Sequence, residues 1–420
     1  MLDIRITTLA NGLRVATDYV PTVESVSLGV WVGAGTRFEA ADVNGVAHML
    51  EHMLFKGTGR RSAREIAEHV EAVGGHMNAY TSRESTAYYV RILKDDVALA
   101  VDVLADILQH SLFDPDELRR ERTVILQEIA QVHDTPDDLI FDNYQSVAFA
   151  GQALGRPVLG DAAIVRDLPR TAILDYLGAH YRADTMLLVA AGNIEHDALV
   201  ALAEAKFGAL TARSAPTPLA ATYVGGELRD ERDLEQVHLA LGFRGVSLVD
   251  PDFHAVSVMS NLLGGGMSSR LFQEIREKRG LAYSIDTFVS CYTDNGLFGI
   301  YAGTSEADVA ELVPVLCEEI ARLADTVSED EVARARAQLR AGVLMALEST
   351  SSRCEQVAQH LLFYGRVIPV EEIVARVDAV TPADVARLAR RVFSSPPTLA
   401  AVGPLARLEP LDMLGRRIAA

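Results

Sequence analysis

The sequence predicts an α+β protein built from two similar domains, each a sheet with helices packed on it. The chain has 420 residues, which is too long for one typical core and fits two domains of about 200 residues. Residues 26–32 and 87–92 alternate as strands do, and amphipathic helical patterns separate such segments. A polar, proline-rich stretch at 211–218 interrupts the chain near its midpoint. We therefore assign a first domain to 1–210, a linker to 211–222 and a second domain to 223–420.

The two halves of the chain repeat each other faintly. Residues 94–104 have a counterpart at 306–316, and residues 116–120 have one at 330–334. Such repetition predicts two domains with one architecture. The histidine pair described below has no counterpart in the second half, so only the first domain is expected to bind a metal.

Composition indicates a packed protein of a reducing compartment. Hydrophobic residues make up 49% of the chain. Cys291, Cys317 and Cys354 are odd in number and far apart, as free thiols are. The N-terminal residues resemble neither a secretory signal nor an organelle presequence, and no apolar run approaches the ~18 residues of a membrane span. We expect no membrane partner and a location in the cytoplasm of a bacterium.

The net charge of −19 indicates which classes of partner are favoured. An acidic protein repels nucleic acid and anionic membranes and attracts cationic ligands over long distances. Nucleic acid is therefore not expected as a partner, and a basic peptide is favoured if the substrate is a peptide. Acidity that merely keeps the protein in solution explains the charge equally well.

The stretch from His48 to His52 is the most informative in the chain. Residues four apart in a helix share one face, so both histidines point at one place, with Glu51 next to the second. Apolar residues surround them from Val46 to Phe55, which predicts a buried helix where a carboxylate needs a cationic partner. Chance spacing is the plainer alternative. A catalytic zinc site takes three protein ligands, so a third must come from elsewhere.

The third ligand is expected on a helix that begins at 114–117 and ends before Pro136. On it, Glu121 and Glu128 lie seven residues apart on one face that is otherwise apolar. For Glu121, a surface ion pair with a neighbouring arginine explains the residue as well as a place near the metal does. For Glu128, which stands among isoleucines and a leucine, that alternative is weaker.

These residues resemble the inverted-motif zinc peptidases of the pitrilysin and insulin-degrading type, peptidase family M16. The similarity spans nearly the whole chain and is greatest to the short branch that includes the catalytic subunit of the mitochondrial processing peptidase. It implies one Zn²⁺ per chain, held by His48, His52 and Glu128. It also implies that Glu51 activates the attacking water and that Glu121 is a further active-site glutamate.

The second half carries the resemblance through residues 264–272 and 275–284. Read alone, the glycines at 264–266 suggest a phosphate loop, but the Walker lysine is missing. The resemblance implies that Arg276 and Tyr283 hold the substrate backbone and the developing oxyanion. It further implies mixed, mainly antiparallel sheets with helices on one face, two domains that close like a clam, and a homodimer.

Specificity is less well defined by the sequence. Residues 74–82 resemble the family's active-site edge strand, where Asn78 and Ala79 would pair with an extended peptide. His76 is expected to be a polar strand residue and not a ligand. Phe55 lies one turn beyond His52, where it lines a pocket for an apolar residue after the cut or simply packs in the core.

Asp138 and Asp142 are four residues apart on what the sequence suggests is a short helical turn. Paired carboxylates suit a guanidinium group, and the pair resembles the acidic residues with which the processing peptidase holds an arginine. An acidic, solvated loop at 134–142 explains the same residues equally well.

The sequence thus predicts a zinc metalloendopeptidase that cleaves short or unstructured, basic peptides, as a processing peptidase does. A general oligopeptide-degrading peptidase without arginine preference is the first alternative. A non-catalytic assembly subunit of the same fold is the second, and the complete set of expected site residues argues against it.

Overall fold

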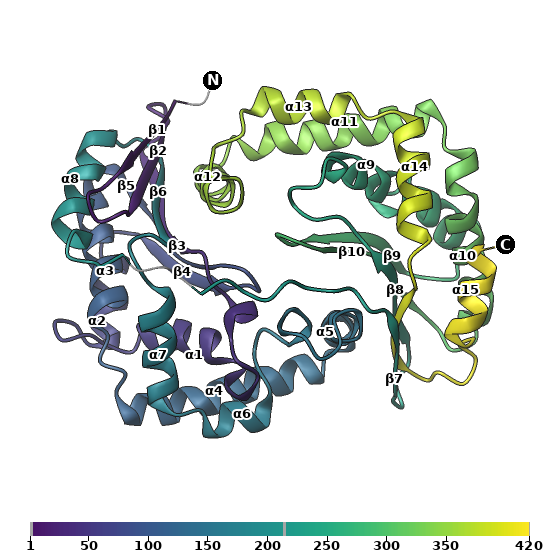
Figure 1. Ribbon diagram of the computed structural model, residues 1–420, viewed down its shortest axis with the longest axis horizontal. Coiled ribbons are helices and arrows are strands. Elements are labelled where there is room, and N and C mark those ends of the chain that lie inside the picture. Colours follow the sequence, from purple (N-terminus) through teal and green to yellow (C-terminus); the bar gives the residue numbers. More distant parts are fainter. Residues whose placement is uncertain (1–2, 213–215, 420) are drawn as a thin grey trace. The chain divides into compact units, whose positions relative to one another are not determined.

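The computed structural model describes residues 3–212 and 216–419, which form two compact units (Figure 1). Unit 1 comprises the residues up to Ala130, Arg156–Leu219 and Met345–Pro369. Unit 2 comprises Gln131–Gly155, Ala220–Leu344 and the residues from Val370 onward. Neither unit is continuous in sequence, because each contains one segment from the other half of the chain.

Unit 1 is built on a six-stranded sheet in which β2 and β6 are parallel and all other neighbours antiparallel. Its strands, in spatial order, are β1 (Ile4–Thr8), β2 (Arg14–Tyr19), β6 (Met186–Gly192), β3 (Ser25–Val32), β5 (Thr86–Leu93) and β4 (His76–Thr81). Strand β4 is an edge strand, as the family resemblance implies. The mixed, mainly antiparallel sheet is likewise confirmed.

Helices of the first half cover one face of this sheet and bury its core. They are α1 (Val46–Leu54), α2 (Ala63–Glu71), α3 (Val97–His110), α4 (Pro115–His133), α6 (Ala162–Asp167), α7 (Arg170–His180) and α8 (His196–Phe207). Strand residues such as Leu28 and Val30 alternate toward this core. Trp31 and Leu187 point the other way and pack on α12 (Thr350–Tyr364).

Unit 2 repeats this strand order without the outermost strand. Its sheet runs β7 (Gly226–Glu231), β11 (Thr398–Gly403), β8 (Val237–Arg244), β10 (Gly296–Thr304) and β9 (Ser284–Cys291). Only β7 and β11 are parallel, which matches β2 and β6 of unit 1. Its helices are α5 (Pro136–Ala148), α9 (Phe253–Gly264), α10 (Val309–Thr326), α11 (Glu329–Ala346), α13 (Val370–Asp378), α14 (Pro382–Phe393) and α15 (Leu411–Ala419). The repetition read from the sequence therefore extends to the topology.

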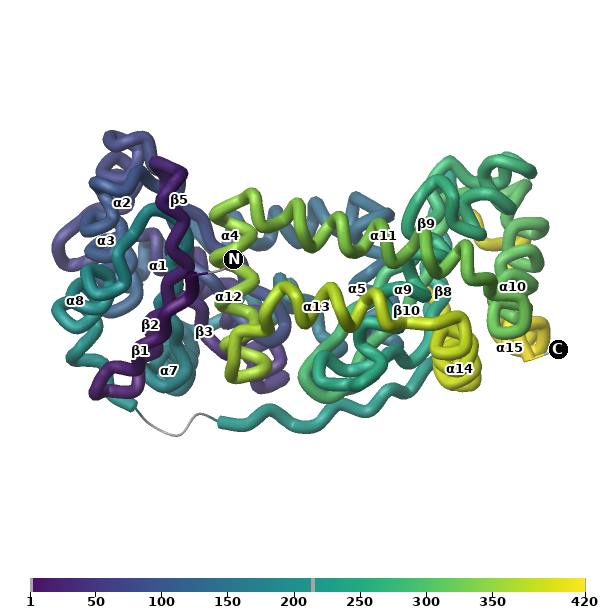
Figure 2. The backbone as a smooth tube through the Cα atoms, turned by 90° about the horizontal axis from the view of Figure 1, so that it is seen from above, coloured from purple at the N-terminus to yellow at the C-terminus, as the bar shows by residue number. Residues whose placement is uncertain are grey.

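Two helices are exchanged between the halves of the sequence. Helix α5 packs on β8 and β11 of unit 2, and α12 packs on β3 and β6 of unit 1. Figure 2 traces how the chain leaves α11, forms α12 and returns in α13. The compact units therefore differ from the predicted boundaries by residues 131–155 and 345–369. The boundaries at 210 and 223 stay a prediction for the two repeats, and residues 213–215 of the linker lie outside the described residues.

The cysteines are free thiols, as their number and spacing predict. Cys317 and Cys354 are buried and Cys291 is half-buried. Burial raises the pKa of Cys291 and of Cys317 to about 12, so these thiols are unreactive near neutral pH. In the part of the chain that the structure describes, no helix has both the length and the apolar character needed to cross a bilayer.

Candidate metal centre

Helix α1 is held in place at its N-terminus by a buried carboxylate. Glu39 is 5% exposed and accepts hydrogen bonds from the backbone of Ala47 at 2.8 Å and of Gly45 at 3.0 Å, and from the Asn44 side chain at 2.8 Å. Gly45 has a φ of 99° and lies so close to Gly160 that a Cβ would approach its Cα to 3.0 Å. Burial raises the pKa of Glu39 to about 7 despite these bonds. The cap fixes where α1 begins.

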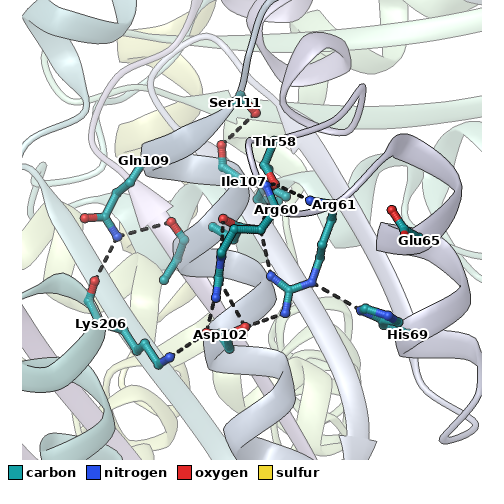
Figure 3. Close-up of polar contacts among 12 residues, drawn as sticks. Thr58, Arg60, Arg61, Glu65, His69, Asp102, Ile107, Gln109, Ser111 and Lys206 are labelled. Atoms are coloured by element: carbon teal, nitrogen blue, oxygen red, sulfur yellow. Dashed lines mark hydrogen bonds and ion pairs between the residues drawn. The ribbon is translucent and has the colours of Figure 1, made fainter.

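A charged network holds the loop that follows α1 (Figure 3). Asp106 of α3 is fully buried in its side chain and accepts from Arg60 at 3.0 Å and from Arg61 at 2.7 Å. Asp102, one turn earlier, accepts from both arginines and from Lys206 of α8. Both ends of α1 are thus anchored, which is what a precise ligand arrangement requires.

Three potential ligands converge at the centre of this assembly. His48 Nε2 and His52 Nε2 each lie 3.8 Å from Oε2 of Glu128, which extends from α4. One nitrogen or oxygen from each side chain lies within 4.8 Å of the others. Oε2 of Glu128 is buried and has no hydrogen-bond partner among the described residues. A buried carboxylate oxygen that faces two imidazoles without a proton donor fits a divalent metal, and two His with one Glu is a zinc ligand set.

His48 is in the form that binds metal. Burial, with a smaller contribution from His52, lowers the pKa of His48 to about 3, so its imidazole is neutral at neutral pH. His52 Nδ1 lies 2.9 Å from Oε2 of Glu121. A proton on Nδ1 makes this contact a hydrogen bond and leaves Nε2 to face Glu128.

Glu121 is nearly buried and lies beside His52 rather than at the surface. Its other oxygen binds Lys56 Nζ at 2.8 Å. Burial alone would raise the pKa of Glu121, but the bonds from His52 and Lys56 outweigh it and lower the pKa. The arginines beside Glu121 in sequence bind elsewhere, Arg119 to Asp116 and Arg120 to Glu117.

Glu51 is held by the edge strand. Thr81 Oγ1 of β4 donates a hydrogen bond of 2.5 Å to Glu51 Oε2. Burial raises the pKa of Glu51, and the bond from Thr81 opposes this. A carboxylate whose pKa is moved toward neutrality is suited to accept a proton from water.

The remaining predicted residues of unit 1 lie on β4 and directly after α1. Ala79 and Thr81 point to the α1 face of β4, and Asn78, which is exposed, points to the opposite face. Phe55 is half-buried, packs against the core of unit 1 and has its ring 6.2 Å from that of Tyr88. This placement agrees with core packing for Phe55.

The other predicted residues lie in unit 2. The Arg276 guanidinium carbon lies 5.0 Å from the centre of the Tyr283 ring and 4.6 Å from that of Phe272. Tyr283 is 78% exposed. Asp138 and Asp142 stand four residues apart on α5, which is a full helix of 13 residues and not the short turn that the sequence suggested, because its apolar face packs on β8 and β11.

Comparisons with known proteins show the family to which the chain belongs. The family described as Insulinase (Peptidase family M16) matches residues 14–162, and the M16 inactive domain matches 167–339. A protein described as an uncharacterized zinc protease, from Rickettsia felis, is 40% identical over 96% of this chain and 98% of its own. The chain belongs to peptidase family M16. The predicted class, a zinc metalloprotease, is thereby confirmed at the level of the family.

One further relative and two solved structures are similar to the chain over nearly all of its length. A probable mitochondrial-processing peptidase subunit beta of Arabidopsis thaliana is 39% identical over 99% of this chain and 81% of its own. The crystal structure of a protease from Helicobacter pylori has a TM-score of 0.88 at 22% identity and covers 96% of this chain and 100% of its own. A chain of Complex III2 from Candida albicans has a TM-score of 0.87 at 22% identity, with 99% of each chain covered. These two structures show the fold.

Sequence reasoning missed three residues that hold the site: Glu39, Lys56 and Thr81. Lys56 stands four residues after His52, on the same helical face, which was a usable signal. Thr81 shares its strand face with Ala79, so alternation alone would have directed it at α1. Glu39 precedes α1 by seven residues, and no spacing rule connects it to the helix.

Proposed function

We propose that the protein is a zinc-dependent endopeptidase that cleaves short or unstructured peptides, with one Zn²⁺ per chain. The observation that carries the proposal is the convergence of His48, His52 and Glu128, in which the buried Oε2 of Glu128 faces both imidazoles and has no hydrogen-bond partner among the described residues. Glu51, held by Thr81 beside these ligands, supplies the proton acceptor that hydrolysis requires.

A zinc ion held by His48, His52 and Glu128 would supply Lewis acidity for the hydrolysis of a peptide bond. Glu51 accepts the proton of the attacking water and passes it to the leaving amine nitrogen. Glu121 keeps the proton of His52 on Nδ1, and Lys56 offsets the charge of Glu121. For Arg276 and Tyr283 we propose the roles that the family resemblance implies, holding the substrate backbone and the oxyanion.

We propose that the substrate adds to the open edge of β4 as an extended strand. Edge strands present unpaired backbone groups, and pairing with them gives affinity with little sequence preference. Asn78 and Ala79 are the proposed pairing residues. Because only an extended chain can pair in this way, the substrates are short or unstructured peptides.

We propose a preference for arginine shortly before the scissile bond, through Asp138 and Asp142. The one-turn spacing of the two carboxylates on α5 and the net charge of −19 support it. Phe55 would contact the residue after the cut. Equal kcat/KM for peptides with Arg and with Ala at that position, or no change in the Asp138→Asn/Asp142→Asn variant, would leave the general oligopeptidase as the function.

The deciding experiment is hydrolysis of an unstructured, quenched peptide by the zinc-loaded protein. We expect activity that a chelator abolishes and zinc restores. Glu51→Gln should retain zinc and lose activity about 10³-fold, because the proton acceptor is gone. Glu68→Gln on α2, which removes an exposed carboxylate paired with Arg64, is the matched control and should leave the rate unchanged.

An inactive protein with one bound zinc per chain would contradict the proposal and favour the assembly subunit. We further propose a homodimer, because a chain of this length resembles family members that pair two subunits. We propose a location in the bacterial cytoplasm, since proteins of Rickettsia felis and Bacillus subtilis are similar to the chain over nearly their whole length. Light scattering on the purified chain checks the dimer, and a mass of 45.5 kDa would contradict it.

A further inference from the structure

A cavity of about 800 Å³ lies in unit 1 on the face of the sheet opposite to α1. Its floor is formed by β3, β5 and the edge strand β4, and its wall by α12. The residues that matter for its chemistry are Trp31, Asn78, Tyr80, Tyr89, Arg91 and Glu355. Nothing in the proposed reaction uses this cavity, although it adjoins the strand to which the substrate is proposed to add.

Glu355 of α12 is the acidic group of the cavity, and neutral donors surround it. Tyr80 Oη donates to its Oε1 at 2.6 Å, Gln359 Nε2 donates to the same oxygen at 2.6 Å, and Trp31 Nε1 donates to Oε2 at 3.1 Å. Among the described residues no lysine, arginine or histidine forms an ion pair with Glu355. A carboxylate accepts about four hydrogen bonds, so Oε2 retains a free acceptor position.

The anchoring of α12 on the sheet does not depend on the charge of Glu355. Arg353 forms a two-bond ion pair with Asp18 at 2.7 and 2.8 Å, and the Asp18 side chain is fully buried. Thr350 adds a hydrogen bond of 2.9 Å to Ser27. Glu355 also bonds Trp31 and Tyr80 of the sheet, but both donors are neutral. A partly buried carboxylate that lies beside two aromatic rings and pairs with no cation among the described residues is the binding partner that a cationic group needs.

The opposite end of the cavity has the opposite charge. Strand register places Tyr80 opposite Ala87, Asn78 opposite Tyr89, and His76 opposite Arg91. Two residues of a strand span roughly 7 Å, so Arg91 lies two such steps from the row that contains Tyr80. Arg91 is therefore separated along the strands from the row nearest Glu355.

We propose that this cavity is a binding subsite for a lysine or arginine side chain of a peptide that has added to β4. Glu355 pairs with the cationic group, and the half-buried ring of Tyr80 packs against its aliphatic stem and its charge. The proposal rests on the proposed peptidase function for the identity of the ligand. It names a second basic determinant, separate from Asp138 and Asp142.

Strand geometry gives this subsite a testable register. Successive side chains of an extended peptide alternate between the α1 face and the cavity face of the sheet. A basic residue that enters the cavity is therefore an odd number of positions from any residue that contacts the α1 face. Scanning arginine along an alanine-rich peptide should give tighter binding at alternate positions only.

The test uses Trp31, which is the one tryptophan in the sequence and lies in the cavity wall. Zinc-loaded Glu51→Gln protein is titrated with peptides that carry Arg, Ala or Glu at the scanned position, and Trp31 fluorescence is recorded. We expect the Arg peptide to change the fluorescence and to bind about tenfold tighter than the Ala peptide.

Three further variants locate the effect. Glu355→Gln should remove the tenfold Arg preference, and Glu355→Asp, which keeps the charge, should retain part of it. Arg91→Gln is the matched control at the far end of the cavity and should keep the preference. Melting temperature and zinc content, compared among all variants, exclude a folding defect as the cause.

Outcomes separate the subsite from the peptidase. Hydrolysis by the wild-type chain with equal affinity for Arg and Ala peptides at every position overturns the subsite and leaves the peptidase. Binding that depends on Glu355, without any hydrolysis, overturns the peptidase and leaves the subsite. If no peptide binds and none is cleaved, both are overturned.

Discussion

Units 1 and 2 share a strand order, yet the helix that follows the central strand differs in each. In unit 1, α1 follows β3, and its Glu51 meets Thr81 of the edge strand β4. In unit 2, α9 follows β8, and its Ser260 donates a hydrogen bond of 3.0 Å to Thr287 of the edge strand β9. The same contact between helix and edge strand thus joins a carboxylate to a hydroxyl in unit 1 and two hydroxyls in unit 2. The duplicated fold needs no metal to form this contact.

The opposite faces of the two sheets differ as well. In unit 1, α12 leaves a cavity above β3, β4 and β5. In unit 2, α5 places Tyr144 directly on the sheet, where its Oη donates to the Phe298 carbonyl at 3.1 Å. A Cβ on Gly242 would lie 2.0 Å from Tyr144 Oη, so the glycine makes room for the ring. The two equivalent helices therefore differ in their packing. Helix α5 fills the sheet face of unit 2, whereas α12 leaves a cavity on the corresponding face of unit 1.

The largest expected effect is on stability, when an aromatic side chain on each of these two sheet faces is replaced by alanine. Tyr144→Ala should reduce the free energy of unfolding by about 4 kcal/mol, because it empties a fully buried site. Tyr89→Ala, whose ring already borders the cavity, should cost about 1 kcal/mol. Urea unfolding followed by circular dichroism measures both, and equal losses would contradict the contrast between a filled and an open face.

Acid should remove the contribution of His180 to the stability of unit 1 at a higher pH than the contribution of Glu331 to unit 2. Glu39 of unit 1, whose pKa burial raises to about 7, takes up a proton in the folded state and offsets part of the His180 loss. Burial lowers the pKa of His180 to about 4, whereas an unfolded histidine titrates near ~6.5. Between these values only the unfolded chain binds the proton, so about 3 kcal/mol of stability is lost as the pH falls. In unit 2, burial alone would raise the pKa of Glu331, but bonds from Arg270 and Ser328 lower it to about 2. The stability that Glu331 contributes is lost only as the pH falls below roughly 4.5.

Trp31 reports on unit 1 alone, so its fluorescence separates the two acid transitions from the far-ultraviolet signal of the whole chain. His180→Phe keeps the ring contacts with Phe38 and Tyr176 and should flatten the unit 1 transition between pH 6.5 and 4. An unchanged acid midpoint of Trp31 fluorescence in this variant would show that other groups control it.

The zinc affinity of unit 1 should depend on Glu121, which is not one of the proposed ligands. Glu121→Gln should weaken zinc binding about 10- to 100-fold, because His52 loses the carboxylate that orients it. Glu117→Gln, one turn earlier on α4, removes only a surface ion pair with Arg120 and should leave the zinc affinity unchanged. Competition with a chromogenic chelator measures both affinities, and equal values would assign Glu121 no orienting role.

The smallest effect tests the contact shared by the two units. Thr81→Val should lower kcat about tenfold at unchanged zinc content, because Glu51 loses the hydrogen bond that positions it. Ser260→Ala removes the corresponding bond in unit 2 and should leave kcat unaltered. A change in KM alone for Thr81→Val would assign Thr81 to substrate binding instead.

Local patterns were sufficient to predict two strands of the first sheet and the helix that carries His48 and His52, whereas the edge strand entered through the family resemblance. The spacing of His48 and His52 and the alternation at 26–32 depend on neighbouring residues, and those elements form where expected. Glu128 could be set on an apolar helical face, but its partnership with the histidines entered through the family resemblance.

Long-range partners could not be predicted from local patterns. Thr81 lies 30 residues from Glu51, and Glu355 lies 324 residues from Trp31. Nothing in the composition of residues 345–369 indicates on which sheet α12 packs. The predicted boundaries separate the two sequence repeats, whereas the compact units group the residues that pack together. The two divisions differ at the exchanged helices α5 and α12.

The exchange of α12 also determines when unit 1 can be completed during synthesis. Asp18, whose side chain is fully buried, pairs with Arg353, 335 residues later in the chain. Until that arginine leaves the ribosome, unit 1 lacks both the partner of a buried charge and the cover for Trp31 and Leu187. The first half of the chain therefore cannot reach its final packed state alone, and a nascent or truncated chain exposes an apolar sheet face that chaperones recognise.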